Sequence, residues 1–396
     1  MMGRLCESMA RTLFLGAVIS LLAIVPAARA AEVKIGLIAA FTGPYSVWGT
    51  QYRQGIELYF DKYGNKLGSD TLSVIYRDEG GINPARAKQL AQELIVRDDV
   101  AVLAGQTFTP NVMAIADVVT EAKVPFVVFN AGTSNAVLAS PYYVRIGGSQ
   151  STLSYIAARW ALEQNFRSCD IAVADYAAGQ DAAEGYAQPF VKGGGKVIET
   201  VAVPLSTTDY SSYVQRIRDA SPQCVFMFMP TGGPMPAAFM KAFAESGLRN
   251  AGIRLIGGTE TQEYELPSIG DAALGVNTAA IWSPNLDNPT NREFVAAYHA
   301  KFGKETIPGM MAAYGYDGMR VIVEMLKATG GKRDAEKAIA AVLGFAWDSP
   351  RGRVSIYPKS HDIVESVYVR EVVKENGVLV NKILKTYPEV RDPRLE

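Results

Sequence analysis

The chain has 396 residues, of which 48% are hydrophobic and 20% are charged, and its formal net charge is −1. These values are ordinary for a globular protein and exclude a disordered, collagen-like or coiled-coil chain, while the near-zero charge argues against a nucleic-acid-binding protein, which needs a basic face. The length exceeds what one hydrophobic core usually serves, so we expect two domains.

The first 30 residues have the pattern of an export signal. Arg4 and Arg11 give a positively charged start, and the stretch from Leu13 to Val25 is apolar. An apolar run of this length suits a signal peptide and is short for a membrane span, although an N-terminal anchor is the alternative. Ala28-Arg29-Ala30 has small residues at the positions that a signal peptidase reads, so we expect cleavage near Ala30 and an exported mature protein.

The next part of the chain alternates apolar runs with helical segments. We expect, in order, strand 33–41, helix 51–62, strand 72–77, helix 84–97, strand 100–104, helix 109–122 and strand 125–129. Two of these helices open with a proline, where its missing N–H costs nothing. Strands that are apolar throughout, with helices between them, indicate a parallel sheet that is covered on both faces.

The same order restarts after Gly147-Gly148. We expect helix 151–165, strand 171–175, helix 181–191, strand 196–203, helix 210–220, strand 225–229, helix 235–246, strand 253–256 and helices 290–302 and 310–328. The C-terminal stretch instead alternates with a two-residue period over 354–356, 363–373 and 378–385, with a hairpin turn at Lys374–Gly377. The sequence therefore predicts an α/β protein with two doubly wound parallel sheets and an antiparallel tail.

Two cysteines, Cys169 and Cys224, precede the predicted strands 171–175 and 225–229. If these strands are parallel neighbours, both thiols lie at the same end of the sheet and a disulfide is possible, as export permits. Two buried cysteines without a bond are the alternative.

Enzyme motifs are missing from the sequence: it has no HExxH, no GxSxG, no Walker A motif and no GxGxxG after a strand. Gly193–Lys196 ends a helix rather than forming a phosphate loop. His299 and His361 lack cysteines or carboxylates at ligand spacing. We therefore predict no enzyme, no metal and no cofactor, with an exported hydrolase as the alternative.

Hydroxyl-rich loops follow the predicted strands, where open α/β sheets bind ligands. In the first half these are loops 41–49, 105–110 and 130–134, and in the second half 175–179, 229–233 and 257–261. Threonine hydroxyls beside helix starts suit a small carboxylate, although Thr109 alone could be only a helix cap. Glu260 could receive a ligand ammonium or be a solvated loop charge.

The ordered set of these loops resembles the periplasmic solute-binding proteins of branched-chain amino-acid ABC transporters, the Leu/Ile/Val-binding, type I class. The resemblance covers essentially the whole mature chain. It implies two Rossmann-like lobes joined by a three-strand hinge, with a ligand cleft between them. The expected boundaries are a signal peptide over 1–30, lobe 1 over 31–147 with 281–362, and lobe 2 over 148–280 with 363–396.

The resemblance also assigns residues to the ligand. Trp48 matches an aromatic that lies against the ligand, Thr109 a carboxylate-binding hydroxyl, and Glu260 the acid that receives the α-ammonium. The loop 131–133 matches one that contacts both groups, and Tyr176 lies near a family tyrosine in a shorter loop. At Thr231 and Gly309-Met310 this chain departs from a family tyrosine and phenylalanine. The predicted ligand-binding set is Trp48, Thr107, Thr109, Ala131, Gly132, Thr133, Tyr176, Thr231, Glu260 and Met310.

The implied function is capture of a small carboxylate, an amino acid of the branched-chain type, by hinge closure and its delivery to an ABC transporter permease. The implied protein is a periplasmic monomer without a cofactor. Because the two departures reshape the pocket, aromatic carboxylates, amides or urea-like solutes are alternative ligands. A receptor subunit that senses the ligand is an alternative role.

Overall fold

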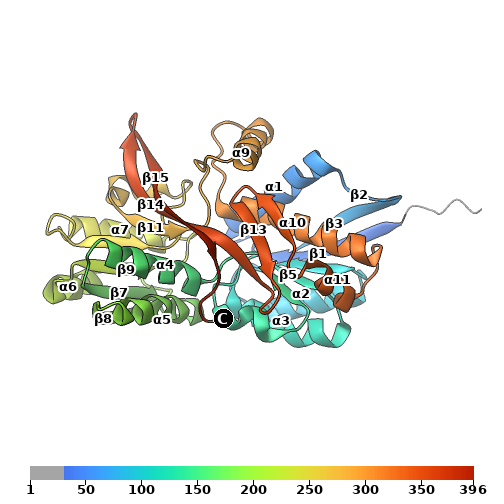
Figure 1. Cartoon of the computed structure of the whole chain (residues 1–396), viewed down its shortest axis with the longest axis horizontal. Helices are drawn as coiled ribbons and strands as arrows, with labels where there is room; N and C mark the ends of the chain where they lie inside the picture. Colours follow the sequence, from blue (N-terminus) through green and yellow to red (C-terminus); the bar gives the residue numbers. More distant parts are fainter. Residues whose placement is uncertain (1–30) are drawn as a thin grey trace, which may run out of the picture.

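The computed structural model describes residues 31–396 (Figure 1). The predicted signal peptide lies outside these residues. The first sheet has six strands in the order β2-β3-β1-β4-β5-β6, parallel except for β2. Its strands are β1 (Glu32–Ala39), β2 (Lys66–Leu67), β3 (Asp70–Asp78), β4 (Val102–Gly105), β5 (Phe126–Val128) and β6 (Tyr143–Arg145). We call the part built on this sheet the first lobe.

Helices cover both faces of the first sheet. They are α1 (Ser46–Tyr63), α2 (Pro84–Val96), α3 (Thr109–Ala122), α10 (Met310–Thr329) and α11 (Ala335–Val342), with the short 3₁₀ helix η1 (Ser134–Ala139). Helices α1 and α10 cross at glycines, because a Cβ on Gly55 would lie 1.9 Å from the carbonyl oxygen of Ala312. This close crossing fixes the start of α1 beside the start of α10.

The second sheet carries the second lobe. Five parallel strands form its main part, in the order β11-β10-β9-β7-β8. Strand β14 pairs antiparallel with β11 and extends this sheet. It also pairs with β15 and, at its start, with β13, which in turn pairs with β12. The strands are β7 (Ser168–Ala174), β8 (Lys196–Val203), β9 (Cys224–Phe228), β10 (Arg254–Gly257), β11 (Asn277–Ala280), β12 (Ala346–Ser349), β13 (Gly352–Tyr357), β14 (Asp362–Glu375) and β15 (Val378–Val390). The remaining helices are α4 (Gln150–Glu163), α5 (Ala177–Lys192), α6 (Ser211–Ala220), α7 (Met235–Glu245), α8 (Leu266–Ile269), η2 (Gly270–Ala273) and α9 (Pro289–Phe302).

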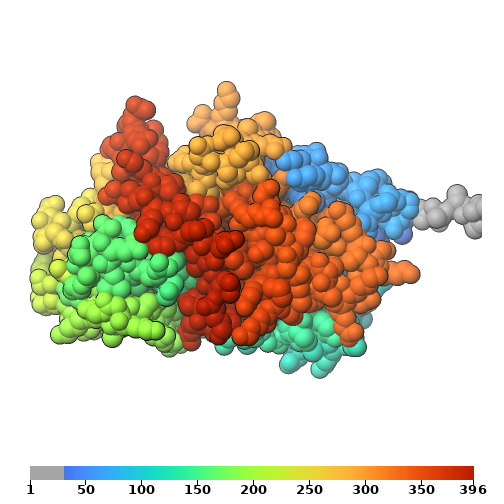
Figure 2. Space-filling view, in the orientation of Figure 1, coloured from blue at the N-terminus to red at the C-terminus, as the bar shows by residue number. Residues whose placement is uncertain are grey.

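The chain passes between the lobes three times, at 146–149, at 281–288 and along β14. Strand β14 pairs with β13 at its start and with β11 further on, so it runs from one lobe into the other (Figure 1). The C-terminal residues lie over the junction of the lobes, where they appear dark red in Figure 2. We call these three passages the hinge.

The predicted α/β fold with two mainly parallel sheets is confirmed, and so is the antiparallel tail. Asn376 and Gly377 both have positive φ, as a two-residue hairpin turn requires. The prediction missed several short elements, which have too few residues to show a clear period: β2, β6, β11, β12, α8, α11, η1 and η2. The predicted boundaries of the lobes remain a prediction.

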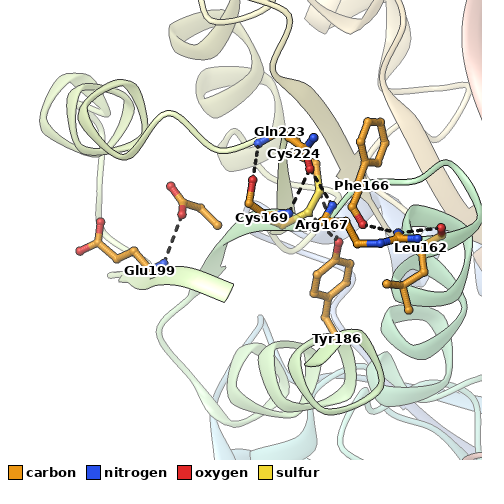
Figure 3. The surroundings of a disulfide bond; sticks show 10 residues. Leu162, Phe166, Arg167, Cys169, Tyr186, Glu199, Gln223 and Cys224 are labelled. Atoms are coloured by element: carbon orange, nitrogen blue, oxygen red, sulfur yellow. Dashed lines mark hydrogen bonds between the residues drawn. A yellow bond between two sulfur atoms is a disulfide. The ribbon is translucent and has the colours of Figure 1, made fainter. Parts of the chain in front are cut away.

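Cys169 and Cys224 form a disulfide (Figure 3). They are directly paired in register on the parallel neighbours β7 and β9, with Cα atoms 4.5 Å apart. The Tyr186 hydroxyl covers the bridge at 3.3 Å from the Cys169 sulfur. Of the two alternatives that the sequence left open, the structure therefore has the bridge, at the amino ends of the strands.

Among residues 31–396, none of the helices has the length and apolar character needed to cross a membrane.

Candidate functional site

A small cavity lies between the lobes, where the carboxyl ends of the strands of both sheets face each other. In this closed arrangement of the lobes its volume is about 20 Å³, which is room for about one water molecule, so the lobes must part to admit a larger solute. Wider hollows lie on the outer surface, away from these strand ends. The cavity is lined by Trp48, Thr107, Phe108, Thr109, Asn130, Gly132, Gln150, Tyr176, Ala178, Phe228, Pro230, Thr231, Thr259 and Met310.

Two stacked aromatic pairs, one from each lobe, form part of the wall. In the first lobe, Trp48 stacks on Phe108 with ring centroids 5.5 Å apart. In the second lobe, Tyr176 stacks on Phe228 at 6.1 Å. Flat aromatic faces offer large apolar contact area to a flat ligand.

Several lining residues stand in the first turn of a helix. Thr109, Gln150 and Met310 are the first residues of α3, α4 and α10, and Ala178 is the second residue of α5. The positive ends of four helix dipoles therefore meet at the cavity, and this arrangement favours an anion. The lining itself has no charged side chain.

The loop 131–133 is fixed by hydrogen bonds from Arg145 on the side away from the cavity. One nitrogen of the buried Arg145 guanidinium donates to the carbonyl oxygens of Ala131 and Thr133, at 2.9 and 2.7 Å. Ala131 has φ +81°, which is unfavourable for a residue other than glycine. The Thr133 hydroxyl donates to the Thr109 hydroxyl at 2.9 Å. Of this loop only Gly132 lines the cavity, so Ala131 and Thr133 set its position.

Glu260 lies at the predicted strand end but does not line the cavity. Its side chain is 0% exposed, and its carboxylate accepts the backbone N–H of Gly258 at 2.6 Å and of Met229 at 3.2 Å. Burial raises the pKa of Glu260 to about 7. The carboxylate is therefore engaged by the backbone of its own lobe.

The lobes touch each other beside the cavity. The Trp48 indole N–H donates to the Tyr264 hydroxyl at 3.3 Å. The indole also lies on Gly232, where a Cβ would be 2.5 Å from the ring nitrogen. Gly232 has φ +78°, and its N–H donates to Glu265 at 2.6 Å. A residue without a side chain at 232 thus permits the contact.

The structure brings seven of the ten predicted ligand residues together on the cavity wall: Trp48, Thr107, Thr109, Gly132, Tyr176, Thr231 and Met310. Ala131, Thr133 and Glu260 lie behind the wall. Whether any of the ten binds a ligand remains a prediction.

The predicted ligand set left out half of the wall: Phe108, Asn130, Gln150, Ala178, Phe228, Pro230 and Thr259. All but Gln150 and Phe228 lie in loops that the sequence analysis singled out. A signal existed for Phe228, at the carboxyl end of a predicted strand, and for Gln150, two residues after Gly148 and at a helix start.

Within residues 31–396 there is no group of three or more histidine, cysteine, aspartate or glutamate residues that could hold a metal ion.

Comparisons with known proteins agree with one another. The family model for periplasmic binding proteins matches residues 32–377. The Leu/Ile/Val-binding protein homolog 6 of Brucella melitensis is 43% identical over 372 residues, which cover 93% of this chain and 95% of that protein.

Solved structures give the same assignment. An ABC transporter solute-binding protein from R. palustris, in complex with 4-hydroxybenzoate, is 41% identical with a TM-score of 0.88, covering 92% of this chain and 99% of that one. A counterpart from Rhodopseudomonas palustris BisB5, in complex with 3,4-dihydroxy benzoic acid, is 42% identical with a TM-score of 0.86 and the same coverage.

Proposed function

The chain belongs to the periplasmic binding protein family as a solute-binding protein of an ABC transporter, and from this premise we propose that its solute is a small aromatic carboxylate of the benzoate type. The observation that carries the proposal is a cavity with stacked aromatic walls, helix N-termini for an anion, and no acidic side chain on its wall.

The absence of an acid from the cavity wall separates the candidate ligands. An α-amino acid brings an ammonium, and burying that group without a carboxylate partner is costly. Glu260, the residue expected to receive it, is engaged by the N–H groups of Gly258 and Met229. A carboxylate without an ammonium needs only donors, which the Gln150 side-chain amide and the threonine hydroxyls of the lining can supply.

The relatives support the same class of ligand. The two R. palustris structures hold 4-hydroxybenzoate and 3,4-dihydroxy benzoic acid, both flat aromatic acids. We expect a ring of this kind to enter when the lobes part, and to contact Trp48 and Phe108 on one side and Tyr176 and Phe228 on the other.

A branched-chain amino acid is the second candidate, because the Brucella relative is named as a Leu/Ile/Val-binding protein homolog. Each Glu260 oxygen accepts one backbone N–H and keeps a further lone pair, so the ammonium of such a ligand would have to reach this carboxylate behind the cavity wall.

In either case, closure follows from contacts that the ligand makes with both lobes. A ligand shifts the open–closed equilibrium only through its differential affinity for the two states. The closed form, secured by contacts such as Trp48 with Tyr264, then presents both lobes to a membrane permease. We propose a periplasmic location, as the family description implies, and no catalytic step.

Calorimetry on the mature protein tests the proposal with benzoate, cyclohexanecarboxylate and leucine. We expect benzoate to bind at least about tenfold more tightly than the other two, because only it offers both a flat ring and a carboxylate without an ammonium. Cyclohexanecarboxylate is the matched control for charge and size. Tight binding of leucine with no detectable binding of benzoate would refute the proposal in favour of the second candidate.

A further inference from the structure

A set of buried polar side chains lies directly behind the cavity wall. We call Gln51, Thr107 and Gln262 the inner polar layer. Gln51 and Thr107 are each 3% exposed, and Gln262 is 0% exposed. Within the described residues, the Gln51 Oε1, Thr107 Oγ1 and Gln262 Nε2 atoms have no hydrogen-bond partner. Buried polar atoms without partners are uncommon and costly, so several in one place call for an explanation.

The inner polar layer borders the cavity through its neighbours. Thr107 itself lines the cavity, and Gln51 lies one turn after Trp48 on α1. Gln262 accepts the N–H of Met310, a lining residue, at 3.2 Å through its Oε1 atom. These contacts bring side chains far apart in the sequence to the same side of the cavity.

Gly309 packs tightly against this layer. A Cβ at this position would lie 2.5 Å from the Gln51 Oε1 atom and 2.6 Å from a ring carbon of Tyr264. Gly309 has φ −115°, so its backbone does not require glycine. Glycine at 309 is therefore explained by the close approach of Gln51 and Tyr264 rather than by backbone conformation.

The free atoms of the layer are complementary in their chemistry. Gln51 Oε1 only accepts a hydrogen bond, Gln262 Nε2 only donates one, and the Thr107 hydroxyl does either. A second carboxylate would satisfy the donor and leave the acceptor unpaired, and an ammonium would do the reverse. A neutral hydroxyl both donates and accepts, so it satisfies the two together.

We propose that the ligand carries a ring hydroxyl, which the inner polar layer recognises. Gln51 accepts a hydrogen bond from this hydroxyl, while Gln262 and Thr107 donate hydrogen bonds to its oxygen. This inference rests on the proposed aromatic carboxylate and narrows it to hydroxylated benzoates. It also assigns specificity to Gln51, Gln262 and Gly309, which the sequence analysis did not include among the ligand residues.

The test compares benzoate with 4-hydroxybenzoate and 3-hydroxybenzoate by calorimetry on the unaltered protein. A site built to bond a hydroxyl rejects the analogue that lacks it, because its polar groups then stay unpaired. We expect at least one hydroxylated acid to bind about tenfold or more tightly than benzoate. Equal affinities for all three acids would overturn the inference and leave the proposed function standing. No binding of any of them would overturn both.

Two variants locate the effect. Gln51→Leu removes the acceptor, and Gly309→Ala pushes the Gln51 side chain out of its position; each should reduce the preference for the hydroxylated acid to about onefold. Gln54→Leu is the matched control, since Gln54 lies on the same helix but accepts the Tyr298 hydroxyl, away from the cavity. If both test variants keep the tenfold preference, the inner polar layer does not bind the hydroxyl and the assignment fails.

Discussion

The cavity and the hinge differ in the charge and in the pairing of their buried polar groups. The cavity and its inner polar layer are neutral, and several of their polar atoms have no protein partner within the described residues. Along and beside the hinge, three buried guanidinium groups each stand in an ion pair: Arg145 with Asp362, Arg351 with Asp317 and Glu365, and Arg370 with Glu263. Within the described residues, single atoms of Arg351, Glu365 and Glu263 also lack a hydrogen-bond partner, but each of these charges has an opposite charge beside it.

The difference follows from the cost of desolvation. A buried charge without a partner costs several kcal/mol, so a permanent structural charge must be paired inside the protein. A neutral amide or hydroxyl without a partner costs only about 1–3 kcal/mol, which a ligand recovers on binding. Paired buried charges thus indicate a structural role in this protein, and we propose that the unpaired neutral groups beside the cavity are the ones that a ligand completes.

The largest expected effect comes from the hinge. Arg145→Met leaves Asp362 buried without its bidentate partner and frees the carbonyls of Ala131 and Thr133. We expect a loss of about 3–5 kcal/mol in the free energy of unfolding, measured by urea denaturation, together with weaker ligand binding.

Arg353→Met is the control for this change, because Arg353 pairs with Asp348 on the surface. Its expected cost is below about 1 kcal/mol. Similar losses in the two variants would contradict the view that the buried hinge pairs are structural.

The disulfide separates stability from binding. It closes a sequence separation of 55 residues at the amino ends of β7 and β9, away from the cavity. The double variant Cys169→Ala, Cys224→Ala should lose about 2–4 kcal/mol of stability. Benzoate affinity, measured on the folded variant by calorimetry, should stay within about twofold. A large loss of affinity would show that the bridge also shapes the cavity.

The sequence predicted the alternation of strands and helices because apolar runs and helix start signals are local. It also placed Trp48, Thr109 and Tyr176 at strand ends, since parallel strands gather their carboxyl ends at one edge. The direction of the Glu260 carboxylate is different, because it depends on the N–H groups of Gly258 and Met229, which only the assembled sheet supplies. Contacts such as that of Gln262 with Met310 likewise arise from the packing of distant segments.

Glu260 allows a test of pH dependence. It is buried, as the acids of the hinge are, but its hydrogen-bond donors are neutral backbone N–H groups rather than arginines. Burial raises its pKa from the usual 4.5 to about 7. The folded state therefore binds more protons than the unfolded state between about pH 4.5 and pH 7. This group favours folding below pH 4.5, and its contribution is lost as the pH rises to 7.

The measurement is the free energy of unfolding at several pH values from 4.5 to 8. We expect Glu260→Gln to flatten the fall of stability over this range, although Glu365, whose pKa burial also raises to about 7, retains its own share. An unchanged slope in the variant would mean that the Glu260 carboxylate is ionised throughout and free to meet a cation.

The smallest effect is expected from the aromatic wall. Phe228→Leu keeps an apolar side chain but removes the ring that stacks on Tyr176 and faces the cavity. Aromatic pairs contribute about 0.5–1.5 kcal/mol beyond their buried area. Benzoate affinity should therefore fall by roughly threefold to tenfold, measured by calorimetry, while cyclohexanecarboxylate, which has no aromatic face, should lose less. An equal loss for both acids would mean that the wall acts by apolar contact alone, and the unpaired polar groups would then be the only feature that sets the cavity apart from the hinge.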